Sequence, residues 1–471
     1  MGDNDDPGVP PAGDAVPQKI QPAPRSGAAR AALTTGAWLA LAAALLGWMF
    51  DGFEMGAFPL VARPALLDVL GLSSSADAGL AADKSADKAA RDAAKGRLDA
   101  QVGPWKGVID AAFLIGAACG GWLFGWLGDR LGRVRAMTFS VLTYALFTGL
   151  CGLAQAAWHL AALRFVSALG MGGEWALGVA LVMECWPARS RPLLAGLIGA
   201  AGNVGYVLAG LLGTAVQQAG VPIGAWGWRV VLGACVLPAF LTFFLRTFVP
   251  ESAKWREAAA SGPRPLLTDI FTPQLRWRAL MGFVLAAVAL IGTWGSVQWI
   301  PAWVSNLTDN NQQMANNAQM CSGLGAVVGS CLGAVASARF GRRGAYFVLS
   351  LGSLAVCAYL FRWQTELHPQ VDGWFLAVVA LTGAWTASFY GFLPLYLPEL
   401  FPTRVRATGQ GFAYNAGRFI AAGGALCTGL LINQVFSGRY DQAGAAISLV
   451  YVVGLAIVWF APETHGRPLP E

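Results

Sequence analysis

The chain has 471 residues, of which 56% are hydrophobic and 12% are charged, and its formal net charge is +6. An ordinary soluble domain carries roughly 25% charged residues, so this composition disfavours a water-soluble fold. The Lys and Arg residues are scattered between apolar blocks instead of forming a basic stripe, which argues against nucleic-acid binding.

Residues 1–33 are rich in Pro, Gly and Ala and begin with the acidic residues Asp3, Asp5 and Asp6. A secretory signal peptide begins with basic residues, so this segment is not predicted to be one. We expect a disordered cytoplasmic tail.

Twelve apolar blocks of about 20 residues follow, the length that spans a hydrocarbon core of about 30 Å. The predicted transmembrane helices are 34–60, 106–127, 136–155, 158–183, 193–217 and 228–248, then 279–303, 315–337, 345–361, 374–397, 408–433 and 444–461. Arg-rich connections recur on alternate turns, and the positive-inside rule places them, with both termini, in the cytoplasm. The sequence thus predicts an all-α, multi-pass protein of the cell (inner) membrane.

The connection at 63–105 is much longer than the others and is predicted to be external. Its second half is rich in Ala and mixed charge. Asp87 with Arg91 and Lys95 with Asp99 are four residues apart, the spacing of ion pairs along a solvated helix. We expect an amphiphilic helix here, and an insertion without function is the alternative.

Three landmarks repeat along the chain at nearly one spacing, which indicates a duplicated six-helix unit. Asp129 to Arg133 corresponds to Ala338 to Arg342, Glu184 to Arg191 corresponds to Glu399 to Arg406, and Pro250-Glu251 corresponds to Pro462-Glu463. Two parallel six-helix repeats that rock about a midplane site give alternating access. The expected parts are an N-terminal bundle (34–250), a cytoplasmic linker (251–278), a C-terminal bundle (279–462) and a cytoplasmic tail (463–471).

These landmarks resemble the major facilitator superfamily, and the segment from Gly125 to Arg135 is similar to its loop signature. The resemblance implies twelve transmembrane helices in two pseudo-symmetric six-helix bundles, and a cytoplasmic gate held by charges. In the second copy Ala338 replaces Asp129, which predicts a weaker latch on that side. The candidate gating residues are Asp129, Arg130, Gly132, Arg133, Glu184, Arg189, Arg339, Arg342, Glu399 and Arg404.

Four further segments bear on the branch of the superfamily. The endings at 250–252 and 462–467 are similar to motifs of the sugar porters. Residues 164–175 and 51–54 look more like the organic-acid and metabolite proton symporters, especially the sialate:proton symporter group.

Ionisable residues inside the apolar blocks are candidates for proton coupling, because each costs at least about 2.5–3.5 kcal/mol at mid-bilayer. Asp51 and Glu54 lie three residues apart, which puts both carboxyl groups on one helix face, about 4.5 Å apart along the axis. Two carboxyl groups that close do not both ionise readily, so one can load and release a proton. The sugar-porter resemblance implies that Arg164 pairs with Asp51.

Glu174 is the remaining acid of this proton-coupling set. Gly170, Glu174 and Gly178 repeat every four residues, which predicts a small-residue face with Glu174 directed inward. A structural hydrogen bond to a neighbouring helix is the alternative for Glu174.

Arg418 lies about ten residues, or roughly 15 Å, into the eleventh predicted helix and so near the midplane. Its guanidinium suits bidentate capture of a carboxylate, and Asn415 shares its face. An ion pair with a buried acid is the alternative. Further candidate substrate-binding residues are Trp294, Gln298, Tyr390, Asn203 and Tyr206.

The leading hypothesis is a secondary active transporter that couples proton entry to symport of a small organic acid. A sugar or polyol proton symporter and a drug efflux antiporter stay open as alternatives. A membrane enzyme is disfavoured, because the three histidines are far apart and form no catalytic cluster. We expect a small-molecule substrate, protons and the lipid bilayer as partners, no nucleic acid, no cofactor or metal, and a functional monomer, as the superfamily implies.

Overall fold

The structure is a computed structural model that describes residues 35–83, 85, 87–219, 226–237, 239–308, 311–364, 370–430, 435–436 and 439–471. The expected tail at 1–33 lies outside these residues. Thr35 to Glu471 form one unit, whose described residues form helices joined by turns and loops and contain no strand.

The first half and the linker contain nine helices among the described residues. They are α1 (Thr35–Val69), α2 (Ala76–Ala82), α3 (Lys88–Leu131), α4 (Arg133–Leu150), α5 (Ala157–Cys185), α6 (Arg191–Gln218), α7 (Trp228–Ala234), α8 (Ala239–Phe248) and α9 (Ala253–Ser261). Short helical turns stand at η1 (Cys151–Leu153), η2 (Ala188–Ser190) and η4 (Asp269–Phe271).

The second half follows the same plan. Its helices are α10 (Arg276–Gly295), α11 (Ile300–Leu307), α12 (Gln312–Phe340), α13 (Arg342–Ala358), α15 (Gly373–Ala387), α16 (Phe389–Leu400), α17 (Arg406–Asn415), α18 (Gly417–Leu430), α19 (Tyr440–Ser448) and α20 (Val450–Ile457). Short turns stand at η5 (Val297–Trp299), η6 (Tyr359–Gln364), η7 (Thr403–Val405) and η9 (Val458–Phe460).

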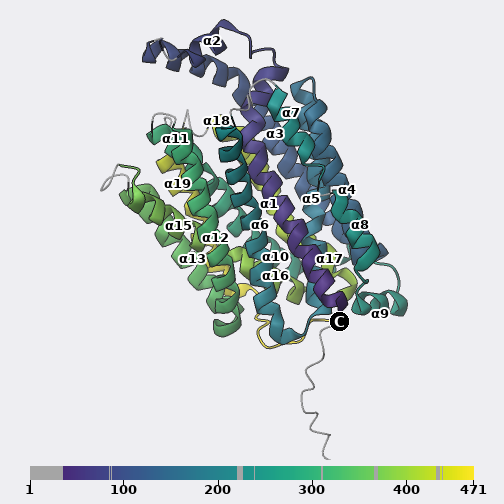
Figure 1. Ribbon diagram of the computed structural model, residues 1–471. Coiled ribbons are helices and arrows are strands. Elements are labelled where there is room, and N and C mark those ends of the chain that lie inside the picture. The colour runs from purple at the N-terminus through teal and green to yellow at the C-terminus, as the bar shows by residue number, and fades with distance from the viewer. Residues whose placement is uncertain are drawn as a thin grey trace, which may run out of the picture. The chain divides into compact units, whose positions relative to one another are not determined.

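Ten of the described helical stretches are long and apolar enough to cross a membrane. The sixth and eleventh predicted spans are not among these ten. The described part of the sixth is divided into α7 and α8, with turns at 235–237, and the eleventh is divided into α17 and α18 at Ala416. The helices run side by side, with α9 and the C terminus at one end and α2 at the other (Figure 1). We call the end that carries Arg133, Arg342 and Arg406 the basic end.

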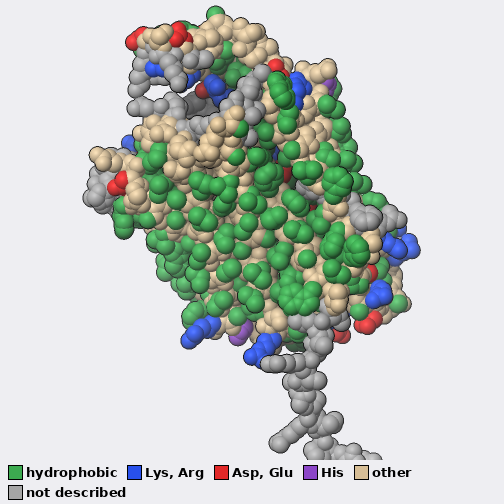
Figure 2. Space-filling model, viewed as in Figure 1, with side chains coloured by type: hydrophobic (Ala, Val, Ile, Leu, Met, Phe, Trp, Pro, Cys, Tyr) green, Lys and Arg blue, Asp and Glu red, His purple; other side chains and the backbone are tan. Residues whose placement is uncertain are grey.

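A broad apolar surface covers the helices between their two ends (Figure 2). On α12, Leu324, Val328, Leu332 and Val335 are all more than half exposed, at a spacing of three or four residues. In water such a stripe would be costly, whereas lipid tails are as apolar as the side chains. The exposed stripe therefore faces lipid.

Glycine allows the helices to pack closely inside each half. Gly325 and Gly329 of α12 lie against backbone carbonyl groups of α15, and Gly333 lies against that of Ser388, the residue that follows α15, and a Cβ atom would collide at each place. Gly116 and Gly120 of α3 meet backbone carbonyl groups of α5 in the same way. Small residues every four positions let membrane helices approach closely. Because Gly116 and Gly120 precede Gly325 and Gly329 by 209 residues, as Asp129 precedes Ala338, the duplication extends to helix packing.

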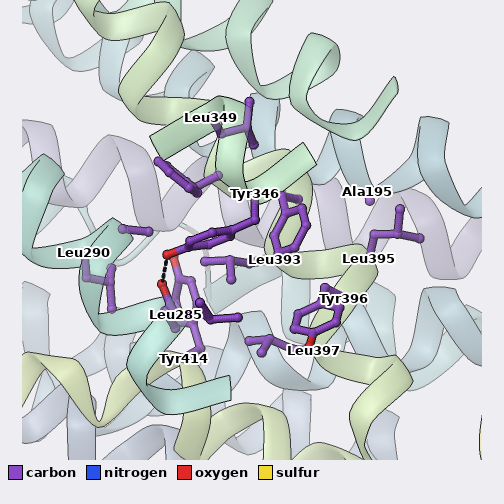
Figure 3. Packing of buried hydrophobic residues seen from close by; sticks show 14 of the residues in the cluster. Ala195, Leu285, Leu290, Tyr346, Leu349, Leu393, Leu395, Tyr396, Leu397 and Tyr414 are labelled. Atoms are coloured by element: carbon purple, nitrogen blue, oxygen red, sulfur yellow. Dashed lines mark hydrogen bonds between the residues drawn. The ribbon is translucent and has the colours of Figure 1, made fainter. Parts of the chain in front are cut away.

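The core of the second half is built on buried aromatic side chains (Figure 3). Tyr346 of α13 is fully buried, and its hydroxyl donates a hydrogen bond of 2.7 Å to the Leu285 carbonyl of α10. A buried phenol requires such a partner, so this bond fixes α13 against α10. The ring of Tyr346 also packs on Phe389 and Phe392 of α16, which joins three helices.

The ion pairs of the predicted external insert differ from those expected from the sequence. Its helix is continuous with the second span, because α3 has 44 residues. Asp87 caps the start of α3 by accepting from the N–H groups of Ala89 and Ala90. Asp99 pairs with Arg63 at 2.8 Å, not with Lys95, because Arg63 lies on the last turns of the neighbouring helix α1.

Candidate functional site

A central cavity lies between the two halves. Its lining comes from α1 and α6 of the first half, and from α10, η5, α11, α12, α15, α16, α17 and α18 of the second. The centres of water molecules can occupy about 80 Å³ of it. One water needs roughly 10–15 Å³ on this measure, so the cavity has room for several waters or a small solute.

Arg418 is the only charged residue among the cavity-lining residues that the structure describes. It is 3% exposed, and its Nε and Nη1 atoms have no hydrogen-bond partner within the described part of the chain. Its guanidinium lies 5.8 Å from the ring centre of Tyr414. A guanidinium in a cavity wall with unpaired nitrogens suits the binding of an anion.

Four of the candidate substrate-binding residues named from the sequence line this cavity: Asn203, Tyr206, Gln298 and Tyr390. The Tyr206 hydroxyl donates to Gln298 Oε1 at 3.0 Å. Asn203 Nδ2 donates to Ser330 Oγ at 3.3 Å. Residues from both halves therefore form one polar wall.

Two other candidates are placed differently. Asn415 lies outside the cavity lining, because its amide donates to the Gly172 carbonyl of α5 at 3.1 Å and to Gly411 at 3.0 Å. The placement of Asn415 as a substrate ligand is therefore wrong. Its amide is used in helix packing. The side chain of Trp294 lies outside the described part of the structure.

The sequence reasoning missed several lining residues. Trp48, Gln319, Ser322 and Tyr414 all line the cavity. Gln319 ends a polar stretch that opens the eighth span, and this polarity inside an apolar block was a usable signal. Trp48 and Tyr414 carry no such signal, because aromatic residues are common in membrane helices.

Asp51 and Glu174 form a buried acid pair between α1 and α5. Both are at most 1% exposed, their carboxyl oxygens have no hydrogen-bond partner within the described residues, and the two groups are near enough to interact electrostatically. Gly47, one turn before Asp51, makes room for the Glu174 carboxyl group, since a Cβ atom there would overlap it. Asp51 also interacts electrostatically with Arg418, so the acid pair lies within electrostatic range of the cavity-lining cation.

Glu54 belongs to a separate cluster. It forms an ion pair with Arg164, whose guanidinium lies 4.0 Å from the ring centre of Phe58 and 4.4 Å from that of Phe113. Thr148 Oγ1 donates to Glu54 Oε1 at 3.4 Å.

The pair between Asp51 and Arg164 implied by the sugar-porter resemblance is therefore wrong, and so is the pairing of Asp51 with Glu54. Three residues of helix turn the two carboxyl groups about 60° apart. Arg164 lies ten residues from Glu174 on α5, or roughly 15 Å along the axis, which brings it beside Glu54. Asp51 and Glu54 thus have different partners on α5.

At the basic end, Asp129 joins the two halves. It forms an ion pair with Arg133 of its own half. Across the seam it accepts from the N–H groups of Ala407 (3.2 Å) and Thr408 (2.7 Å) and from Thr408 Oγ1 (2.6 Å). Asp129 therefore caps the first turn of α17, where backbone N–H groups and the helix dipole favour an anion.

Glu184 completes this contact, which we call the latch (Asp129, Arg133, Glu184, Arg406 and Thr408). Its Oε1 atom accepts from Arg133 and from Arg406 of the second half, each at 3.0 Å. Arg133 also donates to the Thr403 carbonyl at 2.9 Å. The ion-paired side chains of the latch are fully buried. Arg406 was not among the gating candidates.

The second copy of the motif stays within its own half. Arg342 binds Glu399 through two hydrogen bonds of 2.9 and 2.7 Å, and Thr464 donates to Glu399 at 2.6 Å. Arg404 pairs with Asp269 of the linker at 2.8 Å. Gly132 has a φ of 111°, which only glycine adopts readily, and it allows the turn between α3 and α4. The other gating candidates, Arg130, Arg189 and Arg339, are exposed.

The repeated Pro-Glu endings have a structural role that the sequence did not reveal. Glu251 accepts from the N–H groups of Arg133 and Val134, and Glu463 accepts from those of Arg342 and Arg343. Each glutamate thus caps the helix that follows its loop motif. Burial raises the pKa of Glu251. Burial also acts to raise that of Glu463, but the N–H groups of Arg343, His465 and Arg342 outweigh it and lower the pKa.

A family model described as sugar (and other) transporter matches residues 71–261 and 264–471. Among similar curated proteins, a probable 4-methylmuconolactone transporter of Cupriavidus pinatubonensis is 29% identical over 89% of each chain. The sialic acid transporter NanX of Escherichia coli is 26% identical over 73% of this chain and 80% of its own.

Solved structures agree in fold. The proton:xylose symporter XylE has a TM-score of 0.72 and 18% identity, over 93% of this chain and 98% of its own. The human organic anion transporter MFSD10 has a TM-score of 0.60 and 16% identity, over 90% and 99%.

Proposed function

Because this chain belongs to the sugar (and other) transporter family of the major facilitator superfamily, we propose that it is a proton-coupled symporter of a small organic acid. The family consists of membrane transporters for small molecules, and the chain is an integral membrane protein with twelve transmembrane helices in two halves, not an enzyme. The observation that carries the proposal is Arg418, a buried cation in the cavity lining whose Nε and Nη1 atoms have no hydrogen-bond partner within the described residues, with the buried acids Asp51 and Glu174 nearby.

The coupling follows from competition for Arg418. When Asp51 is ionised it attracts the guanidinium, and when a proton neutralises the pair of Asp51 and Glu174 the guanidinium is released to a substrate carboxylate. Proton and substrate then bind together, which is the requirement for symport. Glu54 and Arg164 form an ion pair buried in the first half. Protonation of Glu54 would likewise release Arg164 from its partner.

The latch supplies the gate. While Asp129 caps α17 and Glu184 binds Arg406, the two halves are joined at the basic end, and the cavity must fill from the opposite end. Release of the latch lets the halves rock apart there. We place the basic end in the cytoplasm on the positive-inside rule, with the linker and the C-terminal tail on the same side. The relatives named for muconate and sialic acid support an organic-acid substrate.

The test is uptake of labelled organic acids into proteoliposomes under an imposed pH gradient. Arg418→Ala is expected to lower uptake about 100-fold, because a buried carboxylate then has no cation. Asp51→Asn is expected to lose the response to the pH gradient while it retains substrate exchange. Asp110→Asn is the matched control, because Asp110 is part-exposed and pairs with Lys106. Full pH coupling in Asp51→Asn contradicts the proton-carrier role.

The sugar or polyol alternative has one observation in its favour, the neutral hydrogen-bonding lining that includes Asn203 and Gln298. The two readings differ in their dependence on Arg418. A transporter of neutral polyols would keep nearly normal uptake in Arg418→Ala.

A further inference from the structure

The central cavity has its positive charge at one place only. Apart from Arg418, its described lining is neutral. The neutral polar lining residues are Asn203, Tyr206, Thr293, Gln298, Gln319, Ser322, Thr386, Tyr390 and Tyr414. A solute in this cavity can therefore place one carboxylate on a cation, and any other polar group must be satisfied by amides and hydroxyls.

The clearest neutral group is an amide cluster, which we define as Tyr206, Gln298 and Gln319. Tyr206 donates to Gln298, and Gln319 Nε2 lies 3.5 Å from the Tyr206 carbonyl oxygen. These residues come from α6, η5 and α12, whereas Arg418 comes from α18. Amides and a phenol can donate to and accept from a neutral group, but they do not offset the desolvation of a second carboxylate.

The acids near Arg418 add to this restriction. Asp51 interacts electrostatically with Arg418, and Glu174 with Asp51. One substrate carboxylate replaces the attraction of Asp51 for the guanidinium. A second carboxylate would bring another negative charge toward the same acids without another cation.

The cavity walls favour a flat solute. Trp48, Tyr390 and Tyr414 supply ring faces or edges, and Trp175 holds the Tyr414 ring by stacking at 3.8 Å between ring centres with an interplanar angle of 12°. Gly199 and Gly202 let Tyr390 and Trp48 pack closely against α6. Ring walls stack on planar, unsaturated groups better than on puckered ones.

We propose that the substrate is a monocarboxylate with a flat, unsaturated or aromatic body and a neutral hydrogen-bonding group remote from the carboxylate, and that dicarboxylates of the same shape are rejected. This rests on the proposed function, because it takes Arg418 as the carboxylate site. It adds a rule of selection: one anionic group is accepted, and the far end of the solute is neutral.

The test compares 4-carbamoylbenzoate with terephthalate, two acids of nearly equal shape that differ in one neutral amide or carboxylate. Binding to purified protein and uptake into proteoliposomes are measured for both at pH 7.5. The wild type is expected to prefer 4-carbamoylbenzoate by about 100-fold, the range expected for a buried charge without a partner. Glutaramate and glutarate, a flexible pair, test the flat body, and glutaramate is expected to be the poorer monocarboxylate.

A gain-of-function variant tests the same rule from the other side. Gln319→Arg places a cation in the amide cluster and is expected to raise terephthalate uptake at least about tenfold. Gln319→Met, of similar length and neutral, is the control and is expected to leave terephthalate excluded.

The outcomes separate the two proposals. Equal wild-type transport of 4-carbamoylbenzoate and terephthalate overturns the selection rule and leaves organic-acid symport intact. Failure of both aromatic acids, with transport of glutaramate, overturns the flat body. Transport of a neutral polyol and of none of the four acids overturns the proposed function itself, and this inference with it.

Discussion

The two copies of the basic-end motif show how a duplicated unit acquires different roles in its halves. In the first copy, Asp129 and Glu184 bind residues of the other half. In the second copy, Glu399 binds Arg342 and Thr464 of its own half, and Ala338 has no acid to offer. One seam, where α3 meets α17 and α18, carries the latch, and the other, where α6 meets α12, does not.

The groups that bind Asp129 explain why the second seam lacks both the acid and its binding site. Asp129 is held by the N–H of Ala407 and by the N–H and hydroxyl of Thr408. The repeat equivalents of these residues are Pro192 and Leu193. Proline has no N–H and leucine has no hydroxyl, so α6 offers an acid one donor where α17 offers three. The loss of Asp at 338 thus matches a loss of its binding site.

The largest expected effect is on stability. Glu184→Gln leaves two buried guanidinium groups, Arg133 and Arg406, without their shared carboxylate, and is expected to lower the free energy of unfolding by about 3–5 kcal/mol. Glu399→Gln leaves only Arg342 and is expected to cost about half as much. Thermal unfolding of the purified variants measures both. Equal losses would contradict the asymmetry between the two copies.

The next effect is on transport. Asp129→Asn keeps the shape of the side chain but removes the charge that caps α17, and uptake is expected to fall about tenfold because the halves no longer close firmly at the basic end. Asp269→Asn is the control, since Asp269 forms an ion pair with the exposed Arg404. A similar loss of uptake in both variants would show that the latch contributes no more to transport than the ion pair between Asp269 and Arg404.

A smaller effect is expected when the second seam is given a latch. Ala338→Asp alone should change uptake less than about twofold, because Pro192 and Leu193 do not bind a carboxylate. The triple variant Ala338→Asp, Pro192→Ala and Leu193→Thr supplies the acid and its donors, and is expected to slow uptake several-fold by over-stabilising the closed basic end. Initial rates of uptake in proteoliposomes distinguish the two. A large effect of the single substitution would contradict this account.

The smallest effect concerns the two capping glutamates. The pKa of Glu463 is lowered from 4.5, so its contribution to stability is present above that pH and is lost as the pH falls. The pKa of Glu251 is raised, so folding favours its protonated form and its contribution declines as the pH rises above 4.5. The difference in melting temperature between wild type and Glu463→Gln should therefore grow from pH 4 to pH 6, while that for Glu251→Gln should shrink. Parallel changes in both would refute the distinction.

Much of the scaffold follows from sequence because the signals are long. Blocks of apolar residues identify ten spans directly, and the recurrence of Asp129 at Ala338 and of Glu184 at Glu399 reveals the duplication. The interruption that follows Ala234 could have been read from Pro238, the only proline of that block, because proline interrupts helical hydrogen bonding. The one at Ala416 could not be read, because no proline marks it.

The site is harder to read, because it depends on helix rotation. Asp51 and Glu54 are both acids of one helix face in the sequence, yet one faces Glu174 and the other faces Arg164. A turn of about 60° decides between these partners, and apolar periodicity does not define rotation that closely. Asn415 shows the same limit, since it shares a helix with Tyr414 but donates to α5.

The length of α3 has a mechanical consequence. Its 44 residues extend over roughly 66 Å, about twice the thickness of the hydrocarbon core, with Pro104 in its interior. The helix carries Asp129 in its last turn and Arg97, which holds Asp77 of α2, near its other end. A tilt of about 10° at the Asp129 end would carry the far end by roughly 11 Å. The part of α3 that extends beyond the membrane therefore acts as a lever. A spectroscopic label on it would report, from outside the membrane, when the latch at the basic end opens.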